Sequence, residues 1–157
     1  MTTLPGLRLK QLVLAFGAAY LGLVALTNLV NLLSEATGGD WTFLNSSNTG
    51  YVASVVDVYS WPGWFDELAV AGASLVEGAG ALLFARALLR YRGGGAGAVE
   101  AYQALAWNLG VWCAFIIGSE FFVAYEAEGT FRELLGLGLL MIVVVAVVPD
   151  DVARGTG

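Results

Sequence analysis

The chain has 157 residues, of which 58% are hydrophobic and 13% are charged, and its mean hydropathy is +0.74. Soluble domains carry about 25% charged residues, so this chain has half of their usual charge. The 7 Lys and Arg and 13 Asp and Glu give a net charge of −6, which excludes a nucleic-acid-binding protein that works by neutralising phosphates. The composition and length therefore predict one membrane domain, residues 1–157, embedded in a lipid bilayer.

Residue types on which enzymes and metal sites depend are scarce. The chain has no His, which is the commonest general base and metal ligand, and its single Cys excludes a disulfide framework or a thiolate metal cage. The Gly-rich stretch 93–97 lacks the Gly-Lys-Ser/Thr of a phosphate loop, so we interpret it as part of a flexible cytoplasmic linker, residues 90–102. We therefore expect a protein that is not an enzyme and holds no metal or cofactor.

Four apolar segments are long enough to cross a bilayer, which takes about 20 helical residues. They are residues 11–34, 68–89, 103–125 and 131–148. The first is too long for a signal peptide and lacks a small-residue cleavage site after it, so we expect a retained helix. The last is rich in valine, which would suit a strand in water, but in lipid the backbone must satisfy its own hydrogen bonds. The sequence thus predicts an all-α bundle of four transmembrane helices.

The basic residues are distributed unevenly around these segments. Six of the seven flank the same side of the four predicted spans: Arg8, Lys10, Arg86, Arg90, Arg92 and Arg154. The positive-inside rule then predicts a multi-pass plasma-membrane protein with both termini in the cytoplasm. The opposite surface is strongly acidic, which suggests a halophilic source.

The predicted outer loop, residues 35–65, contains a short amphipathic segment. Its apolar residues recur at helical spacing within Tyr51–Tyr59, and Asn48 or Thr49 is available as an N-cap. Aromatic residues follow, as in a membrane-interface belt: Trp61, Trp64 and Phe65. Either this helix lies on the outer leaflet and closes the bundle, which we favour, or it is a lid or docking surface for a partner.

Polar residues within the predicted spans form a candidate site, because an ionisable group at membrane depth is costly. At 1.5 Å per residue, Glu77 lies roughly 14 Å below the outer face, Glu120 roughly 8 Å and Asn28 roughly 9 Å. The predicted polar cluster comprises Glu77, Glu120, Asn28, Asn31, Ser74 and Ser119. It either holds helices together by hydrogen bonds, which we favour, or binds a proton, a cation or a polar ligand group. Small residues around Glu77 would let a neighbouring helix approach closely.

Arg132, at the outer start of the fourth segment, is a possible ion-pair partner for this cluster. It could pair with Glu120, or with Glu128 and Glu133 at the surface. We favour the surface pairing.

The stretch Ile117-Gly118-Ser119-Glu120-Phe121-Phe122, followed by Phe131-Arg132 and a last apolar helix, resembles a family of predicted small integral membrane proteins. That family is classed as domain of unknown function 2165. It has a Gly-Gly-Glu-Trp-Phe-like stretch in its third helix and a Phe-Arg pair opening the fourth. Glu77 would match its second-helix glutamate, and Asn28 and Asn31 its Asn-rich first-helix end. The family's His and Met-Asp in the outer segment are absent here. The resemblance implies the fold and the glutamates, and no reaction.

Two functions follow from this composition. The first is an accessory or structural subunit that packs against partner subunits of a larger membrane assembly, with the polar cluster as internal bonding. The alternative is a small homo-oligomeric transporter, coupled to an ion or a proton, that uses intramembrane carboxylates. Four helices are few for a monomeric transporter, so the alternative requires several copies. We favour the accessory subunit.

Overall fold

The computed structural model describes residues 6–39, 41–93 and 95–150, and within these ranges it contains helices and no strands. Its elements are α1 (Gly6–Thr37), α2 (Asn48–Val56), the 3₁₀ turn η1 (Asp57–Tyr59), α3 (Trp64–Arg90), α4 (Gly95–Phe121) and α5 (Tyr125–Val147). The four long helices are each long and apolar enough to cross a membrane. The predicted all-α, four-transmembrane-helix bundle is therefore confirmed.

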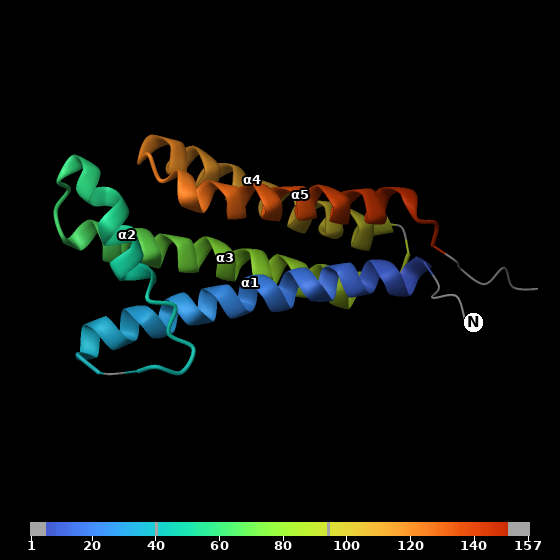
Figure 1. Ribbon diagram of the computed structural model, residues 1–157. Coiled ribbons are helices and arrows are strands. Elements are labelled where there is room, and N and C mark those ends of the chain that lie inside the picture. Colours follow the sequence, from blue (N-terminus) through green and yellow to red (C-terminus); the bar gives the residue numbers. More distant parts are fainter. Residues whose placement is uncertain (1–5, 40, 94, 151–157) are drawn as a thin grey trace, which may run out of the picture.

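The long helices alternate in direction, so α1 begins and α5 finishes at the same end of the bundle (Figure 1). We call this the terminal end, and it also carries the turn between α3 and α4. The opposite end, which we call the loop end, carries residues 38–63 and the turn 122–124. Lys10 and Asp150 pair at 3.1 Å, which holds the two ends of the described chain together.

The linker predicted at residues 90–102 is much shorter, because α4 already begins at Gly95. Glycine is needed here for a close turn rather than for flexibility. Gly93 and Gly95 have positive φ angles of 89° and 61°, and a Cβ on Gly97 would lie 2.6 Å from the carbonyl oxygen of Arg90. The glycines therefore let α4 fold back directly against the last turn of α3.

The boundary between the last two helices also differs from the prediction. α4 ends at Phe121 rather than at 125, and α5 begins at Tyr125 rather than at 131. The chain reverses at Val123, whose φ of 60° is left-handed. The acidic residues that follow, Glu126 and Glu128, lie in the first turn of α5, where a carboxylate complements the helix dipole.

The helices pack as a row in which α3 lies between α1 and α4, and α5 packs on α4. Close approach depends on small residues: a Cβ on Gly17 would lie 2.7 Å from the Phe84 ring, and one on Gly80 would lie 2.7 Å from Leu21. α1 and α5 meet near the terminal end and separate toward the loop end (Figure 1). The bundle is consequently wider at the loop end.

The short helix α2 lies at the loop end beside α3 (Figure 1). It begins three residues earlier than predicted, and its cap also differs from the prediction. The N-cap is Ser47, which makes no side-chain cap bond, and the backbone N–H of Thr49 donates instead to Oδ1 of Asn31 at 2.8 Å. An asparagine of α1 thus caps α2 from another helix.

Aromatic contacts attach the loop after α2 to the end of α4. The Tyr59 hydroxyl donates to the carbonyl of Phe121 at 2.7 Å, and the rings of Trp61 and Phe122 are 5.5 Å apart. These contacts tie the loop after α2 to the loop end of the bundle.

Candidate functional site

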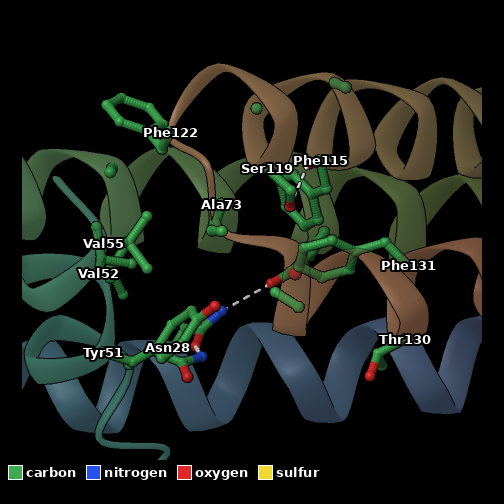
Figure 2. Close-up of a pocket in the computed structure, with 18 of the residues that line it drawn as sticks. Asn28, Tyr51, Val52, Val55, Ala73, Phe115, Ser119, Phe122, Thr130 and Phe131 are labelled. Atoms are coloured by element: carbon green, nitrogen blue, oxygen red, sulfur yellow. Dashed lines mark hydrogen bonds between the residues drawn. The ribbon is translucent and has the colours of Figure 1, made fainter. Parts of the chain in front are cut away.

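Asn28 is the centre of a buried hydrogen-bond network in the loop-end half. Its Nδ2 donates to Oε2 of Glu77 at 2.9 Å, the bond that is dashed beside Asn28 in Figure 2. Its Oδ1 accepts from Nδ2 of Asn48 at 2.6 Å and from Oγ of Ser46 at 3.1 Å. Asn28 and Glu77 are each only 2% exposed. One asparagine of α1 therefore joins α3 to the segment that begins α2.

Asn31, one turn further along α1, organises the same segment. Its Oδ1 accepts from the backbone N–H of Thr49, as described above. The Thr49 hydroxyl also donates to Oε1 of Glu35, one turn after Asn31 on α1, at 3.2 Å. On the other side of Asn28, Oγ of Ser74 donates to the carbonyl of Ala25 at 3.0 Å and links α3 to α1. The Asn-rich end of α1 is therefore where α1, α2 and α3 are bonded together.

Glu120, predicted to converge with Glu77 and Asn28, does not do so. Its side chain is exposed, whereas the preceding residue, Ser119, is buried and lines the interior. Successive helix residues are about 100° apart, so with Ser119 inward Glu120 faces outward. Ser119 donates within α4, from Oγ to the carbonyl of Phe115 at 2.9 Å.

Arg132 forms an ion pair with Glu128, one turn before it on α5. This confirms the predicted surface pairing. The arginine side chain is 66% exposed. It therefore provides no positive charge to the interior.

A cavity of about 390 Å³ lies where the bundle widens, with walls from all four long helices and α2. Its lining is mostly apolar and aromatic, as Phe115, Phe122 and Phe131 show in Figure 2. The polar groups that reach it come from Asn28, Asn48, Glu77, Ser119, Thr130 and two tyrosines, Tyr20 and Tyr51. No lysine or arginine of the described chain lines it. The cavity is thus an apolar chamber with one buried carboxylate.

A layer of apolar side chains fills the bundle between this cavity and the terminal end. Leu14, Leu21, Phe84 and Leu105 have no exposed surface. The buried amide of Asn108 is engaged within α4, where its Oδ1 accepts from Nε1 of Trp112 at 2.9 Å. Among the described residues, no hydrogen bond or ion pair between side chains links the network around Asn28 and Glu77 to the polar groups at the terminal end.

A second buried polar cluster lies at the terminal end. Lys10, only 5% exposed, pairs with Asp150 at 3.1 Å, and the Tyr91 hydroxyl donates to the same carboxylate oxygen at 3.3 Å. Burial raises the pKa of Tyr91 above its ordinary value of 10.0, although the neighbouring Lys10 ammonium opposes this. Lys10 was interpreted from the sequence only as a topology signal, and nothing near it in sequence indicated a distant partner.

The sequence contains little that predicts the hydrogen bonds of Ser46 and Asn48 to Asn28. They belong to the polar run Asn45–Asn48, whose composition is that of any exposed loop. The available signal was the pair Asn28 and Asn31, three residues apart on one face of α1 and thus in need of partners at the same end.

No family model, curated protein or solved structure matches this chain. Its class follows from the four apolar helices: it is a multi-pass helical membrane protein in contact with the bilayer.

Proposed function

We propose that this protein is an accessory or structural subunit of a larger membrane assembly. The observation that carries the proposal is a groove between α3 and α4, which shares Ala114 and Phe115 with the lining of the Glu77 cavity and is otherwise lined by different residues. Ala106, Gly110 and Ala114 follow one another at four-residue spacing along it, and a Cβ on Gly110 would meet no atom within 4 Å. Such small residues let a second transmembrane helix approach closely.

The intramembrane polar groups support a structural role. Asn28, Asn31 and Ser74 all hydrogen-bond across helices or to the α2 segment, as expected for groups that hold a bundle together. The alternative, an ion- or proton-coupled transporter, would need a second conformation that opens the apolar layer around Leu21 and Phe84. The accessory subunit needs no such change.

The partner can be sought with a matched pair of glycine variants. Gly110 and Gly72 both face open space, but only Gly110 lines the groove. We expect the protein from native membranes, in mild detergent, to copurify with a fixed partner, and we expect Gly110→Leu to lose that partner while Gly72→Leu keeps it. Equal partner recovery from both variants would contradict the groove as the docking surface.

Cys113, exposed and three residues from Gly110, distinguishes a heteromeric partner from a second copy. It is the only cysteine of the chain, so a thiol-directed cross-linker in native membranes reports on this face of α4. We expect cross-links to another polypeptide. Cross-links only between two copies of this chain would instead support the oligomeric transporter.

We also propose that both termini lie in the cytoplasm of the plasma membrane, on the basis of the Lys and Arg distribution. In a Cys113→Ala background, Ala96→Cys at the exposed start of α4 gives a single thiol at the terminal end. Impermeant maleimide should label it only after the cells are opened. Labelling of intact cells would reverse the topology.

A further inference from the structure

We infer that the cavity between the helices binds a single-tailed amphiphilic amine, with its ammonium head at Glu77 and its hydrocarbon tail along the aromatic walls. This goes beyond the subunit role and does not depend on it, because Glu77 lines the cavity, which extends to α1, α2 and α5, and does not line the groove, which lies between α3 and α4 alone.

The carboxylate of Glu77 has an unused bonding position. Its Oε2 accepts from Asn28 at 2.9 Å, and within the described part of the chain no hydrogen bond or ion pair reaches Oε1. The residue is 2% exposed and lines the cavity. An oxygen left free in a cavity with mostly apolar walls favours a ligand that supplies a donor, and one that also carries positive charge satisfies the carboxylate best.

The cavity contains a carboxylate and no basic side chain of the described chain, which favours a cationic head group over an anionic one. No basic residue of the described chain lines it, so a phosphate or carboxylate head would meet Glu77 with no compensating cation. An ethanolamine phospholipid would bring such a phosphate along with its amine. An amine without a phosphate avoids that cost, which is why a single-tailed amine fits better than a bilayer lipid.

The walls suit the apolar tail of such a ligand. Trp112 and Phe131 are stacked with ring centroids 6.3 Å apart, and Phe115 lies 5.3 Å from Phe131. Apolar and aromatic side chains of this kind line most small-molecule pockets and would pack against a hydrocarbon tail. The volume of about 390 Å³ falls within the range of small-molecule sites, about 300–1,000 Å³.

Dodecylamine and dodecanol test the proposal, because they have the same tail and differ in the head group, which at neutral pH is cationic in the amine and uncharged in the alcohol. Titration calorimetry on the full chain in a neutral maltoside should show saturable binding of the amine. Dodecanol should bind at least about tenfold more weakly. Equal binding of the two would overturn the proposal, as would displacement of the amine by an ethanolamine phospholipid at similar concentrations.

Two carboxylate variants locate the site. Glu77→Gln should abolish amine binding, and Glu120→Gln, which changes an exposed carboxylate on the other face of α4, should leave it unchanged. Ala73→Leu fills the cavity without touching the charge, and it should also abolish binding even if Glu77→Gln fails to fold. Retained amine binding in the folded Ala73→Leu or Glu77→Gln protein would overturn the proposal.

Discussion

The two ends of the bundle each bury an ionisable side chain, and they stabilise it differently. At the terminal end, Lys10 has a carboxylate partner, Asp150, at 3.1 Å. In the loop-end half, Glu77 has an amide partner, Asn28, at 2.9 Å, and no cation reaches it within the described chain. A charge buried without an opposite charge is costly, so the terminal cluster can stay ionised while the Glu77 cluster depends on hydrogen bonding.

The two halves of the bundle also differ in how densely their side chains are packed. Leu14 and Phe84 have no exposed surface in the terminal half, whereas the loop-end half contains the cavity beside Glu77. Dense packing resists change and an open chamber permits it. The terminal end is thus suited to holding the fold, and the loop end to receiving a ligand. Variants in the Lys10–Asp150 cluster and in the Asn28–Glu77 cluster test whether the two ends differ in this way.

The largest effect is expected from Asp150→Asn. The change keeps the shape of the side chain but leaves the Lys10 ammonium, only 6% exposed, without a counter-charge. We expect a loss of about 3 kcal/mol of stability, which is typical when one partner of a buried pair is removed. The midpoint of thermal unfolding in detergent measures it.

The converse variant is its control. Lys10→Met leaves the Asp150 carboxylate, which is 20% exposed, within reach of water and of the Tyr91 hydroxyl. It should cost only about 1 kcal/mol. If the lysine variant were the less stable of the two, the importance of the buried ammonium would be refuted.

Much of this fold could be predicted from the sequence, because long apolar runs have only one way to satisfy their backbone in lipid. Depth alone also brought Asn28 and Glu77 to nearby levels, and they do bond. Depth does not determine which way a side chain faces around its helix. Glu120 was therefore misplaced, although the inward stripe of Trp112, Phe115 and Ser119 would have placed it outward.

The contacts of the loops and the chain ends could not be predicted in this way. Lys10 meets Asp150, which is 140 positions away in the chain, and Asn48 reaches back to Asn28 across a loop without regular periodicity. Such pairs depend on how whole helices dock, and no local pattern in a single sequence encodes that docking.

The second prediction concerns the centre of the loop-end network. Asn28→Ala removes the donor to the buried Glu77 carboxylate and the acceptor for the half-buried Asn48 and Ser46 side chains together. We expect a loss of about 2 kcal/mol, less than for Asp150→Asn. Asn45→Ala is the control, because Asn45 is at the surface and bonds only within the loop. Comparable destabilisation by the two alanine variants would rule out Asn28 as the centre of the network.

The third prediction sharpens the contrast between the clusters. Glu77→Gln keeps the volume and an oxygen that can accept from Asn28, so the ligand-free protein should lose under about 1 kcal/mol and should still insert and assemble. Yield and elution profile after detergent extraction measure this. Loss of the folded protein would show that an ionised Glu77 holds the bundle together. Both ends of the bundle would then depend on a buried charge for stability.

The smallest effect is expected at Tyr91, where the terminal cluster should respond to alkaline pH. Burial raises the pKa of Tyr91 above 10.0, so the folded protein keeps the phenol neutral while the unfolded chain ionises it. Stability from this residue is therefore full below pH 10.0 and is lost as the pH rises through the higher pKa of the folded state.

Tyr91→Phe removes that response at the cost of one long hydrogen bond to Asp150, about 0.5 kcal/mol near neutral pH. Thermal unfolding across the alkaline range should show a shallower decline for the variant than for the wild type. Lys10 titrates nearby, so the same comparison in a Lys10→Met background separates the two groups. If stability declined equally with pH in the wild type and in Tyr91→Phe, the alkaline sensitivity would come from another group. The Lys10–Asp150 ion pair would then be the part of this cluster that stabilises the terminal end.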